Sequence, residues 1–358
     1  MQSKVTTISF RGQNIYAGID VHLKSWKITV MLEHMEYKTF SQDPDVDILC
    51  GYLNRNFPGG NYLSAYEAGF CGFSLHRELE RNGITNIVVN PADIPTTDKD
   101  KKQKEDKRDS RKIARSLRNG ELIGIYVPSC ELEEVRCLVR YRKTLVKDIS
   151  RNKQRIKSHL YVRGINIPNE LNSSSIHWSA RFTSWLGTIR TSTIHGEMVF
   201  KEIINTTQYM RSQLLQVNRQ LREIGKHGKL GRSISLLHGI PGIGLVVAMT
   251  FLTELFDINR FRTLDQLCSY VGLVPTTNSS GDKENTGKIT PRSNKQLRNC
   301  LIEAAWRAAK QDPALALKYN ELRKRMEPNE AIIRIAKKLL NRIRYVLKNE
   351  VEYVYAIA

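Results

Sequence analysis

Four acidic residues, two widely separated singles and one close pair, have the types and spacing to hold divalent metal ions. Asp20 and Glu67 each end a short apolar stretch that predicts a strand, while Asp106 and Asp109 are spaced to share one face of a helix. Phosphodiester chemistry commonly uses carboxylates from different segments to hold two ions beside the attacking and leaving oxygens. Because such ligands are all oxygen, magnesium or manganese is the expected metal.

Each of these acids also has an ordinary structural explanation. Asp20 could cap a turn, Glu67 could be an exposed residue at a strand end, and Asp109 could favour the first turn of its helix through the helix dipole. Only the order of the acids along the predicted elements favours a shared site.

A second candidate group is the tripeptide Ser279-Ser280-Gly281 in a polar loop. A serine hydroxyl can attack phosphorus and form a phosphoserine if cations hold the phosphate. The candidate phosphate-binding cations around this loop are Lys283, Lys288, Arg292 and Arg298. Taken alone, Ser-Ser-Gly is more typical of a turn.

A third candidate is the glycine-rich stretch at residues 239–244, which precedes an apolar run. It resembles the hairpin of a helix-hairpin-helix element, in which glycines let backbone N–H groups approach a DNA phosphate. Gly242 and Gly244 are therefore candidate nucleic-acid contacts. The alternative is a structural turn between two core helices.

The composition favours a polyanionic partner. The chain has 358 residues, with 56 Lys and Arg against 36 Asp and Glu, a net charge of +20. Such a charge drives sequence-independent binding to nucleic acid, and an anionic membrane is the weaker alternative. Because no run of 18 apolar residues and no signal peptide is apparent, we expect a cytoplasmic, nucleoid-associated protein without a membrane partner. The six cysteines lack CxxC spacing, so they predict neither a zinc site nor a disulfide framework.

The first part of the chain has the element order β-β-β-α-β-α-β-α. Three antiparallel strands are predicted in residues 14 to about 40, followed by a helix at 45–56, a strand at 62–67, a helix at 72–81 and a strand at 84–89. A basic segment at 98–118 then leads into a further helix. This order is the connectivity of an α/β RNase H-like fold.

Two long amphipathic helices, at residues 131–163 and about 196–224, predict an antiparallel coiled-coil arm. The first carries ten Lys or Arg and one acid between positions 136 and 163, which favours a nucleic-acid-facing stalk or an oligomer arm over a merely solvated helical pair. Candidate contacts in the basic segment and this helix are Lys104, Lys107, Arg108, Arg140, Arg142, Lys143, Arg151, Lys153, Arg155 and Lys157. We expect three domains: residues 1–128, the arm at 129–228, and a mainly helical domain at 229–358.

Ordered motifs along nearly the whole chain resemble the DEDD transposases of the IS-one-ten insertion-sequence family, which includes an eleven-eleven branch and the related Piv-type DNA invertases. The motifs are GIDVHLKSWKITV, YEAGFCGF, KEDKRDSRKIA, SLRNGELIGIYVP, LLHGIPGIG and YVGLVPTTNSSGDKENTGKITPRSNKQLRNCLIEAAW. Two departures are Glu105, where the family usually has Thr, and Ser110, where it usually has Ala. Glu105 adds a competing carboxylate beside Asp106.

The resemblance implies a RuvC-like domain whose acids, here Asp20, Glu67, Asp106 and Asp109, bind magnesium. It also implies a C-terminal transposase domain whose nucleophilic serine maps onto Ser280, with Ser279 as the alternative. A structured bridge RNA that guides the enzyme to target and donor DNA, and dimers that assemble into tetramers, are further implications.

These expectations combine into one hypothesis: an RNA-guided recombinase that moves an insertion sequence through a phosphoserine intermediate. Two alternatives stay open. One is a metal-dependent, structure-specific nuclease resembling a Holliday-junction resolvase, in which water is the nucleophile. The other is a non-catalytic basic protein that binds DNA or RNA.

Overall fold

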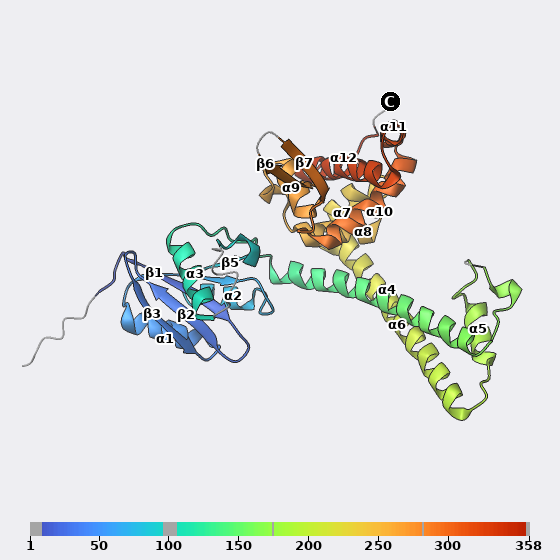
Figure 1. Cartoon of the computed structure of the whole chain (residues 1–358), viewed down its shortest axis with the longest axis horizontal. Coiled ribbons are helices and arrows are strands. Elements are labelled where there is room, and N and C mark those ends of the chain that lie inside the picture. The colour runs from blue at the N-terminus through green and yellow to red at the C-terminus, as the bar shows by residue number, and fades with distance from the viewer. Residues whose placement is uncertain (1–8, 96–105, 174, 281–282, 356–358) are drawn as a thin grey trace, which may run out of the picture. The chain divides into compact units, whose positions relative to one another are not determined.

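The chain forms two compact units, Met1–Val127 and Pro128–Ala358 (Figure 1). The computed structural model describes residues 9–95, 106–173, 175–280 and 283–355. Within these ranges, the side chains that lie outside the description are those of residues 106–108, 277–280, 283–286 and 288.

A five-stranded mixed sheet forms the centre of the N-terminal unit. In spatial order its strands are β3 (Glu36–Gln42), β2 (Trp26–Met31), β1 (Asn14–Val21), β4 (Asn61–Glu67) and β5 (Thr85–Val89). The strands β1, β2 and β3 pair antiparallel, whereas β1, β4 and β5 pair parallel. This element order agrees with the predicted RNase H-like connectivity.

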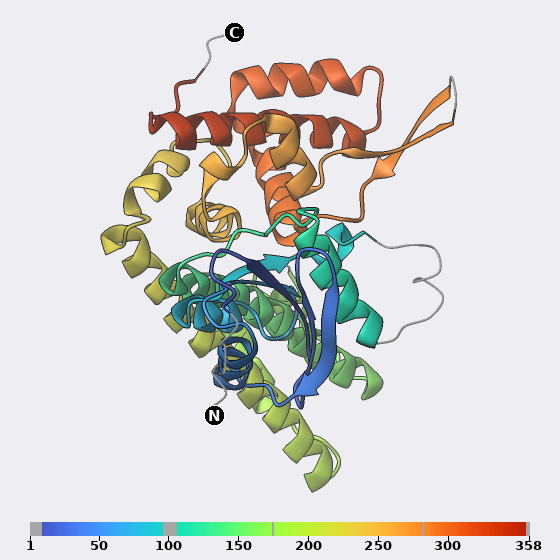
Figure 2. The same cartoon turned by 90° about the vertical axis from the view of Figure 1, so that its left-hand side faces the viewer.

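Helices cover both faces of this sheet (Figure 2). On one face lie α1 (Val46–Asn56) and α2 (Ser74–Arg81), which pack on the apolar side chains of β1. The helix α3 (Asp106–Arg118) covers the opposite face, where its Ile113 packs with Ala65 of β4. The two faces therefore have different roles: one holds the larger core and the other receives α3.

The strand β1 divides its residues between these two faces. Ile15, Ala17 and Ile19 are buried against α1 and α2. Because successive side chains of a strand point to opposite faces, Gly18 and Asp20 face α3. The alternating pattern thus directs the acid of β1 to the α3 side.

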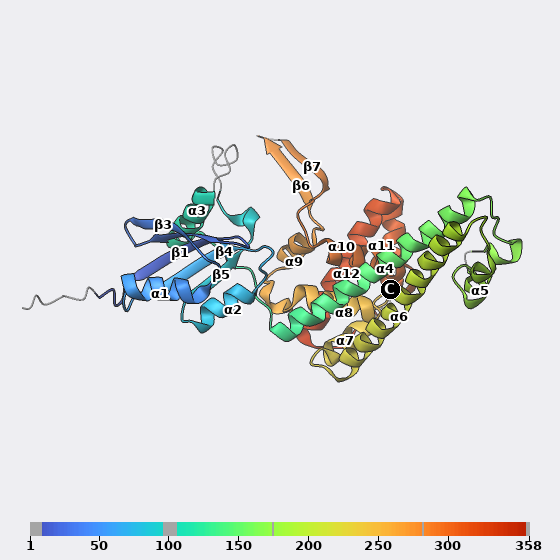
Figure 3. The same cartoon turned by 90° about the horizontal axis from the view of Figure 1, so that it is seen from below.

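The C-terminal unit begins with a long helical pair (Figure 3). The helices α4 (Cys130–Val162) and α6 (Ile194–His227) pack antiparallel, and α5 (Ala180–Thr188) lies at their far end. Both long helices begin at a capping hydroxyl, from Ser129 and Thr193 respectively. The predicted pair of long helices is present, and its coiled-coil character stays a prediction.

The rest of the unit is a helical core with one protruding hairpin. Its helices are α7 (Gly231–His238), α8 (Leu245–Leu255), α9 (Leu264–Val271), α10 (Lys295–Gln311), α11 (Pro313–Arg323) and α12 (Pro328–Asn349). Residues of α4 and α6 belong to the same core cluster, so the predicted arm and C-terminal domain share one compact unit. Within the described residues, no helix is long and apolar enough to cross a membrane.

The serine-bearing segment differs from the predicted polar loop. It forms a two-stranded antiparallel hairpin of β6 (Pro275–Ser280) and β7 (Lys283–Ile289). Its sequence has no apolar alternation, so the usual strand signal is absent. Backbone pairing between the two segments forms the hairpin, and the β-branched Thr276 and Thr277 of β6 suit extended backbone.

Candidate functional site

Two of the predicted acids are neighbours in the sheet of the N-terminal unit. The parallel strands β1 and β4 pair in register up to Ile19 and Tyr66, and the next residues along the two strands are Asp20 and Glu67. Laterally paired residues of a sheet share a face, so both acids emerge on the α3 side at the carboxyl ends of their strands. The Asp20 side chain keeps 20% of its surface exposed, which leaves its carboxylate accessible.

A direct backbone contact places α3, with Asp109, on this face. A Cβ atom at Gly18 would lie 2.2 Å from the carbonyl oxygen of Ser110 and 2.3 Å from the backbone nitrogen of Ala114. Only glycine permits so close an approach of helix to strand. Since Gly18 lies two residues before Asp20 and Asp109 precedes Ser110, this contact brings the helix acid over the strand that carries Asp20.

Polar contacts hold α3 in this position. The buried hydroxyl of Ser110 lies 2.9 Å from that of Thr29 on β2, and Thr29 in turn lies 2.9 Å from Thr39 on β3. Arg111 forms an ion pair with Glu36 of β3 at 2.8 Å. The serine that departs from the resembled family pattern therefore joins the helix to the sheet beside the acids.

The immediate surroundings of the acids suit a hard cation. A nitrogen of His22, Nε2, lies 3.1 Å from Oδ2 of Asp20, and the other candidate donors are carboxylate oxygens. Among the described side chains, no group of three His, Cys, Asp or Glu lies close enough to hold a metal ion. Asp106 occupies the first position of α3, but its side chain lies outside the description.

The serine candidates lie on the hairpin of the C-terminal unit. Ser280 is the last residue of β6 and pairs with Lys283, which places its backbone at the hairpin tip. The side chains of Ser279, Ser280, Lys283 and Lys288 lie outside the description. At the hairpin base, Nη1 of Arg298 donates to the carbonyl oxygen of Thr290 at 2.7 Å. Arg298 therefore supports the base of the hairpin through its backbone.

Two family models match the chain. The DEDD transposase model matches residues 17–162, which include all four acids, and the model described as "Transposase IS116/IS110/IS902 family" matches residues 234–320, which include the serine hairpin. The chain belongs to the IS110 family of transposases. These are the enzymes that the IS-one-ten resemblance predicted from the motifs.

Relatives named as transposases come from several bacteria. A putative transposase, y4qE, of Sinorhizobium fredii is 31% identical over 241 residues, which cover 67% of this chain and 57% of that relative. The transposase of insertion sequence IS1533 from Leptospira borgpetersenii is 25% identical over 82% of this chain and 85% of its own length. The IS1111A transposase of Coxiella burnetii is 26% identical over 66% of this chain and 63% of its own length.

A buried carboxylate that the sequence reasoning missed links the transposase helices. Glu254 of α8 is almost fully buried and accepts two hydrogen bonds from Arg140 of α4, at 2.7 and 2.8 Å. Asn294, which caps α10 just after the hairpin, donates to the same carboxylate at 2.9 Å. The hydrogen bond to Glu254 raises the pKa of Arg140. A single acid within the apolar run LVVAMTFLTEL was the available signal.

Several candidate nucleic-acid contacts on α4 also have partners within the IS110-family chain. Two of them contact residues of other helices: Arg142 donates to Asn218 at 2.7 Å, and Lys143 donates to Gln296. Two contact residues of α4 itself: Arg151 pairs with Asp148 at 2.9 Å, and Arg155 donates to Asn152 at 2.7 Å. The ammonium of Lys153 lies 5.2 Å from the ring centre of Trp178. Lys157 is partly buried, and Arg292 donates its backbone N–H to the Thr290 hydroxyl. The side chains of Lys107 and Arg108 lie outside the description, as does all of Lys104.

The glycine-rich turn lies between α7 and α8. Gly242 has φ +84°, and a Cβ there would lie 2.4 Å from the carbonyl oxygen of Ala304 on α10. Gly244 precedes α8 as its N-cap, and a Cβ there would meet nothing within 4 Å. Close packing thus accounts for Gly242, whereas the surroundings of Gly244 are open.

Proposed function

We propose that this protein moves an insertion sequence by cutting and rejoining DNA at the acids of the N-terminal unit and the serine hairpin of the C-terminal unit. The observation that carries the proposal is the position of Asp20 and Glu67 at neighbouring strand ends on the face covered by α3. Strands from different parts of the chain are there arranged to present carboxylates together.

The acids would hold magnesium, with manganese as a substitute, through the carboxylates of Asp20, Glu67, Asp106 and Asp109. The bound ion supplies positive charge that neutralises these acids and stabilises charge on the reacting phosphate. The acids themselves supply oxygen donors, which hard cations prefer, while the nitrogen of His22 beside Asp20 is the one described donor of another kind.

The nucleophile in this proposal is the hydroxyl of Ser280. Its Oγ–P bond forms as a P–O bond of the DNA strand breaks, and the departing oxygen takes up the serine proton. A DNA hydroxyl then attacks the phosphoserine, which restores the phosphodiester and the free serine. Lys283, Lys288 and Arg292 are the proposed cations for the phosphate.

Two partners belong to the proposal on the strength of the family resemblance. One is a structured bridge RNA that pairs with donor and target DNA, and the other is a second copy of the chain, in a dimer or tetramer. The net charge of +20 supports a polyanionic partner without distinguishing RNA from DNA.

The decisive experiment looks for a covalent protein–DNA adduct. Wild-type protein, element DNA, magnesium and the flanking transcript are incubated and separated under denaturing conditions. We expect an adduct from wild type and from Ser279→Ala, and none from Ser280→Ala. An adduct that persists in Ser280→Ala contradicts the serine assignment. Cleavage without any adduct favours the nuclease, and no chemistry in wild type favours the binding protein.

The metal site has a test that does not depend on activity. Binding of Mn²⁺ to wild type, followed by electron paramagnetic resonance, should weaken in Asp20→Asn and in Glu67→Gln. Asp47→Asn, which alters an exposed acid of α1 on the opposite face of the sheet, is the control. Equal Mn²⁺ binding by all four proteins contradicts the metal assignment.

A further inference from the structure

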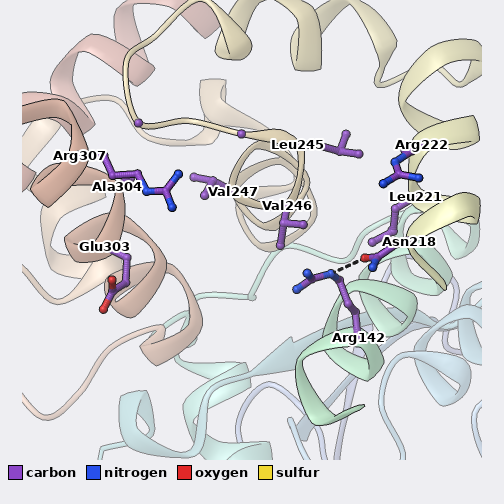
Figure 4. A pocket seen from close by; sticks show the side chains of 12 residues that line it. Arg142, Asn218, Leu221, Arg222, Leu245, Val246, Val247, Glu303, Ala304 and Arg307 are labelled. Carbon is purple, nitrogen blue, oxygen red and sulfur yellow. Dashed lines mark hydrogen bonds between the residues drawn. The ribbon is translucent and has the colours of Figure 1, made fainter. Parts of the chain in front are cut away.

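A cavity of about 490 Å³ opens in the C-terminal unit where α8 begins (Figure 4). Arginines from three helices line it: Arg142 of α4, Arg222 of α6 and Arg307 of α10. In Figure 4, Arg142 and Arg222 lie on one side of the first turn of α8 and Arg307 on the other. Three elements far apart in the sequence thus contribute the same type of side chain to one cavity.

The cavity has an excess of positive charge. Its lining holds three guanidinium groups and one carboxylate, that of Glu303. Arg142 is oriented by its 2.7 Å hydrogen bond to Asn218. The side chains of Arg222 and Arg307 have neither an ion pair nor a hydrogen bond within the part of the chain that the structure describes. Since guanidinium groups stay charged at neutral pH, this lining would attract an anion.

A second hollow lies next to the arginine-lined cavity and shares part of its lining. That hollow, of about 290 Å³, shares Gly242, Gly244 and Arg307 with the first and extends to Gln311 and Tyr355. Both hollows are lined by Gly242 and Gly244 of the α7–α8 turn, which the close approach of Gly242 to Ala304 holds against α10. Two adjacent hollows with a shared arginine suit a polymer with successive phosphates better than a single small anion.

We propose that this cavity binds a backbone phosphate of a nucleic-acid strand through Arg142, Arg222 and Arg307. The planar guanidinium groups match phosphate oxygens in geometry and charge. The inference goes beyond the proposed reaction, because it concerns strand binding away from the acids and the serine. It also holds for a nuclease or a binding protein with the same cavity, so its failure is distinguishable from failure of the serine chemistry.

The first test measures binding of the full chain to a short labelled duplex DNA and to an RNA of the same sequence, without magnesium, over a range of salt concentrations. The double variant Arg222→Gln with Arg307→Gln should bind about tenfold more weakly or worse. The slope of log affinity against log salt should become shallower by the amount expected for about one phosphate contact. A loss with DNA alone, RNA alone or both identifies the bound strand. No loss with either overturns the proposal.

A matched control separates local contact from general charge. Arg219 lies on α6, three residues before Arg222, but does not line the cavity. Arg219→Gln therefore removes the same charge outside the cavity. We expect Arg222→Gln to weaken binding more than Arg219→Gln does. Glu303→Gln, which removes the one lining carboxylate, should strengthen binding. Equal effects of the two arginine changes overturn the proposal.

A substitution at Gly244 tests the cavity without loss of the fold. Gly244 has φ −90° and ψ 177° at the N-cap of α8, with open space for a side chain. Asp and Asn both cap helices well there, so neither Gly244→Asp nor Gly244→Asn should lower the melting temperature. Only Asp places a carboxylate in the cavity, and it should bind nucleic acid about tenfold more weakly than Asn does. Equal binding by the two variants overturns the proposal.

Discussion

Gly18 determines how closely the helix acid approaches the strand acids. A Cβ atom at Gly18 would collide with the backbone of Ser110 and Ala114, so there is no room for a methyl group. The sequence points to Asp20, Glu67 and Asp109 as candidates, because each follows a recognisable strand or helix pattern. It could not identify the importance of Gly18, because that depends on where α3 lies in the folded unit.

We predict that Gly18→Ala forces α3 away from β1. Overpacking of this kind costs about 1–3 kcal/mol of unfolding free energy, and backbone atoms cannot move aside as a side-chain tip can. Denaturant unfolding should reveal this loss, together with weaker Mn²⁺ binding.

Gly51→Ala provides the control for this change. Gly51 lies within α1, and a Cβ there would meet nothing within 4 Å. Because alanine has a higher helix propensity than glycine, the unfolding free energy of this variant should rise by about 0.5–1 kcal/mol. A Gly18→Ala protein as stable as wild type would contradict the close contact.

At the scale of elements, the link between Arg140 and Glu254 joins α4, α8 and the start of α10. We predict that Glu254→Gln and Arg140→Gln each lower the unfolding free energy by about 1.5–3 kcal/mol, because a hydrogen bond to a charged group is lost. The double variant should lose less unfolding free energy than the two single variants lose when their losses are added. Strict additivity in this double-mutant cycle would show that the two residues do not stabilise the unit together.

A second element-scale link should make stability depend on pH. Asp312 is buried, caps α11 through the N–H of Leu315, and accepts hydrogen bonds from Arg342, at 2.7 Å, and Tyr353. Burial alone raises the pKa of Asp312, but the hydrogen bonds from Arg342, Tyr353 and Leu315 outweigh it, so the pKa lies below its ordinary value.

A lowered pKa means that the ionised carboxylate stabilises the folded state. That stability is fully present above the ordinary carboxyl pKa of about 4 and is lost as the pH falls through the lowered value. We therefore predict that Asp312→Asn costs about 3 kcal/mol at neutral pH. The difference from wild type should shrink below about pH 4. A difference that is constant across this range in urea titrations would contradict the assignment.

Long elements were more predictable than short polar ones. The helices α4 and α6 follow from apolar periodicity over many turns, whereas the β6–β7 hairpin has no such periodicity and was expected to be a loop. Similarly, the sequence of α8 is an apolar run. The role of Glu254 cannot be derived from that run, because the partners of Glu254 come from α4 and from the start of α10.

For the whole molecule, the acids and the serine belong to different compact units. The first unit ends at Val127, one residue before the predicted boundary, because the sheet and its helices complete their own core. The second predicted boundary does not separate compact units, because Val139, Leu145 and Val217 of the long helices pack into the transposase core. Periodicity predicts such helices but not the core that they join.

This separation gives a prediction for mixed oligomers. If the proposed site combines acids of one copy with the serine of another, Asp20→Asn protein mixed with Ser280→Ala protein should form the covalent DNA adduct. Only the Asp20→Asn subunit, which keeps its serine, should carry the DNA, and a size tag on one subunit identifies it on a denaturing gel. Absence of adduct from the mixture, with wild type active, would place both groups in one chain.

The helix α10 sets a fixed distance between two functional regions of the C-terminal unit. Asn294 caps it beside the base of the serine hairpin, and Arg307 lies along it at the arginine cavity. At about 1.5 Å per residue, these two positions are roughly 20 Å apart. That distance corresponds to about six base pairs of duplex DNA. A nucleic-acid strand bound at the cavity therefore lies at a fixed distance from the base of the serine hairpin.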